Sequence, residues 1–357
     1  MNQQSPPRPT RRAIPVTHSK ATTGLFVIAL FFALYLARQI LLPVVLALLF
    51  GLLLAPVVRG LRQLKVPTAI AAAVVVFTLL GVTGAGAYLL AEPASTWLEK
   101  APHLIQRLEA RLSPIRQRVE EVSETAEEVG EVGDAPQAAP RVVIETPGFR
   151  RAVFANVPIF AAGVVIWIFM LFFILATRDL FMEKLRKILP TREDKRHAVE
   201  IAQAMEVEVS RYLFTAAMIN FGLGVVVAML MAMLGMPNPL LWGALAGLLN
   251  FIPYLGPAVA AVVIGAVALL SFENVGYALL VPGLFMLLTS LEGQLVTPLI
   301  MGRRLQLNPL VVFLSVVFWG WLWGIFGALM AVPIVVSLKI IFDRTPSLAP
   351  VGELLGR

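Results

Sequence analysis

The chain contains no cysteine and only three histidines. His18, His103 and His197 are far apart in the 357-residue sequence. The lack of cysteine excludes disulfides, thiolate metal sites and cysteine nucleophiles. A zinc or iron centre needs several protein ligands close together, and isolated histidines do not supply them. The sequence therefore predicts neither a metal site nor a bound cofactor.

Sequence motifs of the common enzyme classes are absent as well. The chain has no His-Glu-x-x-His pair, no Gly-x-Ser-x-Gly elbow and no phosphate loop ending in Gly-Lys-Ser or Gly-Lys-Thr. These absences favour a protein that is not an enzyme. A transporter of this sequence that used ATP would need a separate subunit to hydrolyse it.

Charged residues are scarce and hydrophobic residues are abundant. The charged share is 14%, the hydrophobic share is 58%, and the mean hydropathy is +0.82. Soluble domains are less hydrophobic and more charged, so the composition predicts an all-α polytopic membrane protein in a lipid bilayer. The net charge of +7 comes mostly from basic residues beside apolar runs. Such residues set membrane orientation, so we expect no nucleic-acid partner.

The apolar runs predict about eight membrane segments. Five are single spans, at residues 22–37, 40–58, 69–90, 157–176 and 212–234. The rest are a crossing over 277–297 and two hairpins, over 240–270 and 307–342. The predicted parts of the chain are a disordered basic N-terminus (1–21), three membrane segments (22–91), an extracytoplasmic part (92–156), a fourth segment (157–177), a cytoplasmic amphipathic segment (178–211), a C-terminal bundle (212–342) and a cytoplasmic tail (343–357).

The run over 240–270 is the most informative part of the sequence. Its 31 residues exceed the roughly 20 that cross a bilayer once. Asn250-Phe251-Ile252-Pro253-Tyr254-Leu255-Gly256-Pro257 interrupts it. Prolines and glycine release backbone groups that lipid cannot satisfy, so such a break lies inside protein or beside water, often at a transport site. Reading this run and 307–342 as hairpins places Arg303, Arg304, Lys339 and Arg344 in the cytoplasm with both termini.

Residues 98–129 carry apolar residues at alternating spacings of three and four. This pattern predicts an extracytoplasmic amphipathic helix with a coiled-coil seam, which Pro114 should kink or split. The seam either packs on the same chain or joins subunits, and the sequence leaves both open. Residues 130–147 read as a flexible return to the membrane.

Glu292 is the outstanding ionisable residue of the C-terminal third. A carboxylate within a membrane must be paired, protonated or wet, so Glu292 is a proton or cation relay, a ligand-binding group, the partner of Arg303 or Arg304, or a residue near the membrane interface. Asn250 and Tyr254 are candidates to bind a polar solute, to cap the broken backbone, or to do both. The candidate substrate or ion path comprises Asn250, Pro253, Tyr254, Gly256, Pro257, Glu292, Gln294, Thr297 and Pro298.

An ordered set of motifs resembles a known family. It comprises the segment Asn250 to Pro257, Glu292 with Pro298 and Gly302, Leu307-Asn308-Pro309-Leu310, Gly324-Ile325-Phe326-Gly327-Ala328 with Ala331-Val332-Pro333, the prolines Pro43, Pro56 and Pro67, and Leu189-Pro190. These residues resemble the bacterial autoinducer-2 exporters, or PerM-type permeases, over about residues 22–342. The resemblance implies an inner-membrane secondary transporter that forms homo-oligomers. Members of that family are associated with export of autoinducer-2 or with sodium/proton exchange.

Three functions follow as hypotheses. The first is proton-coupled export of a small polar organic molecule, with Glu292 as the protonatable group. The second is exchange of a monovalent cation, Na⁺ or Li⁺, for protons at the same carboxylate. The third is a membrane scaffold that transports nothing and recruits partners through the helix at 98–129.

Overall fold

The computed structural model describes residues 20–127, 149–188, 192–301, 307–345 and 348–356, and within them the regular elements are helices joined by short turns. An isolated antiparallel bridge pairs Leu307 with Gly356. The all-α prediction is therefore confirmed for these residues. Residues 1–19 of the predicted disordered N-terminus, the whole predicted return at 130–147, and Gly302, Arg303 and Arg304 lie outside the described residues, whereas Lys20 and Ala21 begin the first helix and were wrongly predicted as disordered.

The first helices form a bundle built on small side chains. Helix α1 (Lys20–Leu36) meets α2 (Arg38–Gln63) at Ala37, and α3 (Thr68–Glu127) and α4 (Phe149–Ile188) follow. Ala47, Gly51 and Ala55 of α2 are buried at spacings of four, so they lie on one face. Around α2 pack Ala71, Ala72, Val75 and Val76 of α3 and Leu171 and Leu175 of α4. Small residues let such helices approach closely.

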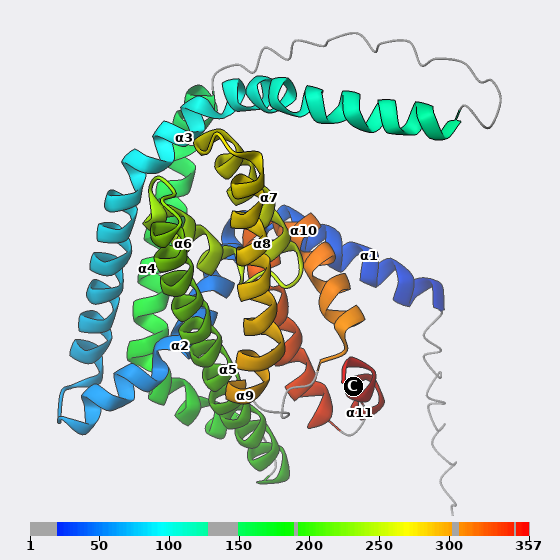
Figure 1. Cartoon of the computed structure of the whole chain (residues 1–357). Helices are drawn as coiled ribbons and strands as arrows, with labels where there is room; N and C mark the ends of the chain where they lie inside the picture. Colours follow the sequence, from blue (N-terminus) through cyan, green and yellow to red (C-terminus); the bar gives the residue numbers. More distant parts are fainter. Residues whose placement is uncertain (1–19, 128–148, 189–191, 302–306, 346–347, 357) are drawn as a thin grey trace, which may run out of the picture.

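Helix α3 is longer than the predicted span and is not split. It runs as one helix from Thr68 to Glu127, past Pro114, and extends beyond the bundle (Figure 1). A proline removes one helical hydrogen bond and bends a helix more readily than it ends it. Of the two effects predicted for Pro114, the split is therefore wrong, and the kink stays a prediction.

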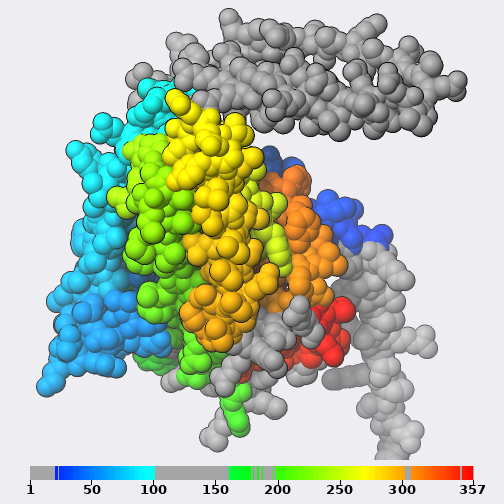
Figure 2. Space-filling view, viewed as in Figure 1, coloured from blue at the N-terminus to red at the C-terminus, as the bar shows by residue number. Residues whose placement is uncertain are grey.

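The first predicted hairpin is present as two short helices. Helix α5 (Arg192–Met233) is followed by α6 (Pro239–Leu249) and α7 (Leu255–Ser271), with the break at 250–254 between them. Helix α8 (Val275–Leu291) then leads into a π-helical turn, η1 (Glu292–Val296), and into α9 (Thr297–Met301). Helices α5 and α8 pack side by side on the face shown in Figure 2.

Helix α10 (Pro309–Asp343) is the second hairpin, because it folds back on itself at Gly324. Gly324 has a φ of 67° and a ψ of −149°, a conformation that side chains other than hydrogen strongly disfavour. On either side the halves run antiparallel. The Ser315 hydroxyl donates to the carbonyl oxygen of Ala331 at 3.2 Å, and a Cβ added at Gly327 would overlap the carbonyl oxygen of Trp319.

Five described helices are long and apolar enough to cross a membrane. They are Arg38–Gln63, Thr68–Lys100, Ala198–Met233, Val275–Met301 and Pro309–Asp343. Four apolar helices are shorter: Gly24–Leu36, Ala161–Thr177, Pro239–Leu249 and Leu255–Ser271. The last two are the halves of the first hairpin. A helix of 11 residues, such as α6, is about half of a crossing.

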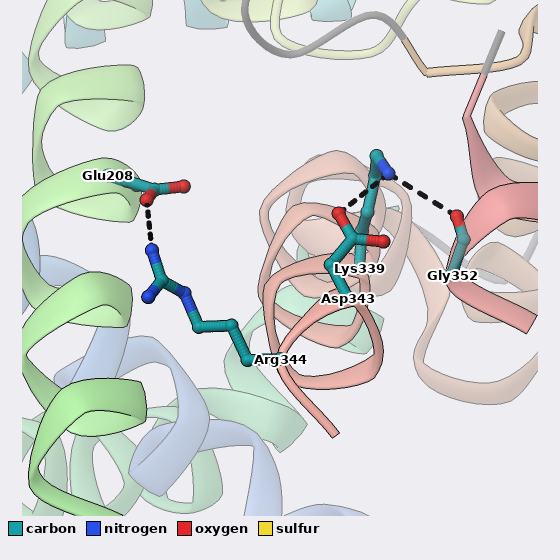
Figure 3. Close-up of polar contacts among 5 residues, drawn as sticks. All are labelled: Glu208, Lys339, Asp343, Arg344 and Gly352. Carbon is teal, nitrogen blue, oxygen red and sulfur yellow. Dashed lines mark hydrogen bonds and ion pairs between the residues drawn. The ribbon is translucent and has the colours of Figure 1, made fainter. Parts of the chain in front are cut away.

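The C-terminal helix α11 (Ala349–Leu355) packs against both ends of α10. Near the end of α10, Lys339 Nζ donates to the Asp343 carboxylate at 2.8 Å and to the Gly352 carbonyl oxygen at 3.3 Å (Figure 3). At its beginning, the Asn308 amide donates to the carbonyl oxygen of Leu355 at 3.1 Å. The sequence predicted only a tail here, so this docking is an addition to the fold.

Ion pairs fasten α5 to its neighbours at the same end of the bundle. Arg59 of α2 pairs with Glu206 at 2.9 Å, and Arg344 at the end of α10 pairs with Glu208 at 2.9 Å (Figure 3). The basic ends of α2 and α10 therefore lie at one end of the molecule. Figure 1 places the far part of α3 at the opposite end.

Candidate functional site

Close contact between α5 and α6 brings two asparagines together. One face of α6 carries Gly243, Gly247 and, at its end, Asn250, because these residues are four and three positions apart. One face of α5 likewise carries Asn220 and Gly224, four positions apart. A Cβ added at Gly224 would lie 2.9 Å from the Gly243 carbonyl oxygen, and one at Gly247 would lie 2.8 Å from that of Asn220. The backbones touch because neither helix has a side chain there, and small residues allow helices in membranes to approach this closely.

The break between α6 and α7 is held in an unusual backbone conformation. Tyr254 has a φ of 63° and a ψ of −53°, outside the regions that side chains other than glycine favour. Two residues later, a Cβ at Gly256 would overlap the carbonyl oxygen of Leu249. Glycine is therefore required at 256 for α7 to start beside the end of α6. The sharp turn keeps Asn250 at the tip of the hairpin.

The turn after α8 is π-helical and places Thr297 over Glu292. The backbone amide of Thr297 donates to the carbonyl oxygen of Glu292, five residues earlier. In an α-helix, residues five apart lie about 140° apart around the axis, whereas the wider π-turn stacks them. Such single π-turns inside α-helices occur frequently at functional sites.

Four side chains from these elements form a continuous hydrogen-bonded cluster, which we call the polar cluster: Asn220, Asn250, Glu292 and Thr297. The Asn250 side-chain nitrogen donates to Asn220 Oδ1 at 2.8 Å and to Glu292 Oε2 at 3.4 Å. The Thr297 hydroxyl donates to Glu292 Oε1. Both oxygens of the carboxylate are thus satisfied by donors, and the chain of contacts joins α5, the tip of the first hairpin and the π-turn.

The polar cluster lies beside the second hairpin. Ile252, in the break, is buried against Val316, Ala328 and Ala331 of α10. The cluster itself is enclosed to different degrees: Asn220 is 6% exposed, while Asn250, Glu292 and Thr297 are half-buried. The carboxylate therefore has a partly enclosed side toward the asparagines and an open side.

The structure sorts the predicted path residues into three groups. Asn250, Glu292 and Thr297 come together. Pro253, Gly256 and Pro257 shape the break and are at least half-buried. Tyr254, Gln294 and Pro298 are exposed and lie outside the polar cluster.

The alternative uses of Asn250 and Glu292 have different outcomes. The Asn250 side chain binds two side chains, and α7 has no side-chain cap at Tyr254, so the predicted capping role is wrong. The predicted pairing of Glu292 with Arg303 or Arg304 lies outside the described residues. Within those residues Glu292 forms no ion pair.

Asn220 is the member of the cluster that sequence reasoning missed. It lies within the predicted span 212–234, where a polar side chain facing lipid is expensive and therefore usually meets a partner. Its position among apolar residues was the signal in the sequence that it has a partner. The sequence did not identify that partner, because the contact depends on how α5 is rotated against α6.

The cluster offers a carboxylate, two carboxamides and a hydroxyl that donates to the carboxylate. Among the described residues no group of three or more histidine, aspartate or glutamate side chains gathers as metal ligands. Such a set can hold a proton, a monovalent cation or a polar solute.

Comparison with known proteins gives matches across most of the chain. The model of the AI-2E family transporters matches residues 25–347. A putative transport protein of Haemophilus influenzae is 27% identical over 334 residues, 90% of this chain and 91% of its own. A putative transport protein of Mycobacterium tuberculosis, MT0215, is 30% identical over 316 residues, 86% of this chain and 83% of its own. The AI-2 transport protein TqsA of Escherichia coli is 39% identical over 147 residues, 41% of this chain and 42% of its own.

Proposed function

Because this chain belongs to the AI-2E transporter family, we propose that it is a proton-coupled secondary transporter that exports a small polar organic molecule. The family places it among membrane transporters and leaves the substrate open. The name of the partial relative TqsA makes autoinducer-2 the first solute to test. The observation that carries the proposal is the placement of Glu292, which accepts hydrogen bonds from Asn250 at the hairpin tip and from Thr297 after the π-turn.

Proton uptake at Glu292 would change these two contacts unequally. An ionised carboxylate accepts hydrogen bonds only, and a protonated one must also donate. The Thr297 hydroxyl can rotate and accept a hydrogen bond from a protonated Oε1. The amide nitrogen of Asn250 can only donate, and a protonated Oε2 is a poorer acceptor than an ionised one, so a proton on Oε2 would weaken that contact.

Weakening the contact between Asn250 and Glu292 would loosen the link between the hairpin tip and the π-turn. A solute with hydroxyl groups would donate to the ionised carboxylate in place of Asn250, so the solute and the proton compete for Glu292. Each ligand then favours a different state of the site, and such exclusion couples export of the solute to entry of the proton.

The orientation we propose follows from the charge distribution. The basic ends of α2 and α10 lie at one end of the bundle, fixed by the ion pairs of Arg59 and Arg344 to α5. Basic residues remain on the cytoplasmic side, so this end and both termini face the cytoplasm of a bacterial inner membrane. The far part of α3 is then extracytoplasmic. About eight membrane segments and a homo-oligomer complete the proposed arrangement.

The test is proton movement by the purified protein in liposomes with an imposed pH gradient. A pH-sensitive dye inside the vesicles reports proton flux when autoinducer-2, sodium or lithium is added. We expect flux that depends on autoinducer-2 in the wild type and its loss in Glu292→Gln, which keeps the shape of the side chain and removes its charge. Ser290→Ala, an exposed polar change two residues away, is the matched control and should transport as the wild type does.

Three results would contradict the proposal. Flux that depends on sodium or lithium, and not on autoinducer-2, would identify a cation/proton antiporter. Equal flux in the wild type and Glu292→Gln would remove the carboxylate from the mechanism. No flux in folded protein with any of these solutes would favour the scaffold.

A further inference from the structure

Arg38 is an isolated charge in an apolar part of the chain. It is the one charged residue between Lys20 and Arg59 in the sequence, and it begins α2 just after Ala37. Its side chain is exposed, and the described residues place no carboxylate within ion-pair distance of it. A charge surrounded by apolar surface is costly unless it meets an anion or water. Arg38 therefore needs a partner from outside the described part of the chain.

Two aromatic rings lie beside this arginine. The Arg38 guanidinium lies over the ring of Tyr35, 4.8 Å from its centroid. Tyr35, near the end of α1, stacks on Trp321 of α10, with the ring centroids 6.4 Å apart and the ring planes 24° from parallel. Trp321 is 71% exposed. We call Arg38, Tyr35 and Trp321 the aromatic row, and it presents one cation and two amphipathic rings at the surface.

The aromatic row lies where three helices meet. It joins the end of α1, the start of α2 and α10 close to Gly324, where α10 folds back. A hydrogen bond fastens α1 to α10 at the same place, because Trp323 Nε1 donates to the carbonyl oxygen of Leu34 at 3.4 Å. A ligand held by the row would therefore bridge α1, α2 and the second hairpin.

Helix length places the aromatic row near one membrane interface. Arg38 and Arg59 are 21 residues apart on α2, which is about 32 Å along a straight helix. The hydrocarbon core of a bilayer is about 30 Å thick, so the two arginines approach opposite interfaces. Tilt would bring Arg38 deeper, and its long side chain would extend back to the head groups. Tyrosine and tryptophan are enriched at that level.

We propose that the aromatic row binds the head group of an anionic phospholipid. The planar guanidinium of Arg38 donates a forked pair of hydrogen bonds to the lipid phosphate, and Tyr35 and Trp321 lie beside it at head-group depth. Charge selects this lipid, because a zwitterionic lipid carries a cationic group beside the same phosphate. The site is separate from the polar cluster, so it depends neither on the solute nor on the direction of transport.

A carboxylate from another protein is the competing partner for Arg38. The neighbours Leu36 and Ile40 are apolar and exposed, and residues 1–19, which precede α1, contain no acidic residue. A carboxylate brought to Arg38 by a protein would lose its water among such apolar side chains, which is costly. The phosphates of lipids already lie at the interface, so the lipid is the partner that this surface favours.

The test identifies the lipid beside Arg38 by fluorescence quenching. The chain has no cysteine, so Ile40→Cys accepts one fluorophore near the aromatic row, and Phe77→Cys on α3, also exposed, is the control position. In phosphatidylcholine vesicles, lipid with brominated acyl chains is added as phosphatidylglycerol or as phosphatidylcholine. We expect an affinity for phosphatidylglycerol about fivefold higher at residue 40, the factor for one basic residue at a membrane surface. At residue 77 the two lipids should quench equally.

Three variants in the Ile40→Cys protein assign this preference to the row. Arg38→Gln removes the charge and should abolish the preference. Arg38→Lys keeps the charge and loses the planar fork, so its preference should be intermediate. Trp321→Leu removes a ring at an exposed position and should also lower the preference.

Four results would overturn the lipid site. They are equal quenching by the two lipids at residue 40, the same preference at residue 77, a preference that persists in Arg38→Gln, and no quenching by either lipid at residue 40, which would mean that protein covers the row. If Arg38→Gln does not fold, an unchanged preference in Trp321→Leu also overturns the site. None of these results depends on proton flux, so the proposed function is tested separately.

Discussion

Replacement of Asn250 by alanine tests whether the polar cluster is a connected unit. The change removes the bond of 2.8 Å to Asn220 and that of 3.4 Å to Glu292. Side-chain hydrogen bonds in membrane proteins contribute about 0.6 kcal/mol on average and up to about 1.7 kcal/mol. Bonds to a charged acceptor contribute about 1.5–3 kcal/mol in soluble proteins. We therefore expect Asn250→Ala to lower the free energy of unfolding by about 1–3 kcal/mol.

The connection itself is measured by a double-mutant cycle of Asn220→Ala and Asn250→Ala. The free energy of unfolding is obtained for both single variants and the double variant by titration from lipid-detergent mixtures into denaturing detergent. Because Asn220 is buried and its amide oxygen accepts from Asn250, we expect a coupling energy of about 0.6–1.7 kcal/mol. That energy corresponds to a factor of about 3–18 in the unfolding equilibrium.

Additivity would refute this reasoning. Independent sites add to within about 0.3–0.5 kcal/mol, so a coupling energy below that limit would mean that Asn220 and Asn250 do not share a bond that matters. Ser290→Ala paired with Asn250→Ala is the control cycle. Ser290 is exposed on α8, and we expect no coupling between these two residues.

Two further predictions concern the hairpins. Gly256→Ala should destabilise the protein by about 1–3 kcal/mol, the usual range for overpacking, because its methyl group would overlap the carbonyl oxygen of Leu249. The control is Gly283→Ala, at a position with open space, which should change stability far less. Equal losses of stability in the two variants would contradict the geometry of the break. Gly352→Leu should release α11 from α10, since Gly352 packs directly on Asp343. Faster proteolysis of the C-terminus would reveal the release, and an unchanged cleavage rate would contradict it.

The hairpins were predictable because length and backbone chemistry both require them. The run 240–270 is too long for one crossing and too interrupted for two, and the structure divides it into α6 and α7. The second hairpin required only a position where the chain can reverse, which Gly324 supplies with its positive φ. Both arguments use local properties, which a sequence displays directly.

The composition of the site was predictable in part. Asn250, Glu292 and Thr297 stood out as polar residues in apolar surroundings, and the structure brings them together. Asn220 was missed because its partner is 30 residues away and is set by the contact between α5 and α6. The π-turn was missed for another reason: Pro298 shows that regular α-helical pairing is interrupted here, and it does not show which pairing replaces it.

The most direct test of the central claim is to observe the protonation of Glu292 itself. Infrared difference spectra between acidic and alkaline buffer detect the C=O stretch of a carboxylic acid as it appears. We predict such a band in the wild type, over the pH range in which proton flux begins, and its absence in Glu292→Gln. A band of equal strength in both proteins, or none in wild-type protein that transports, would show that Glu292 is not the group that carries the proton.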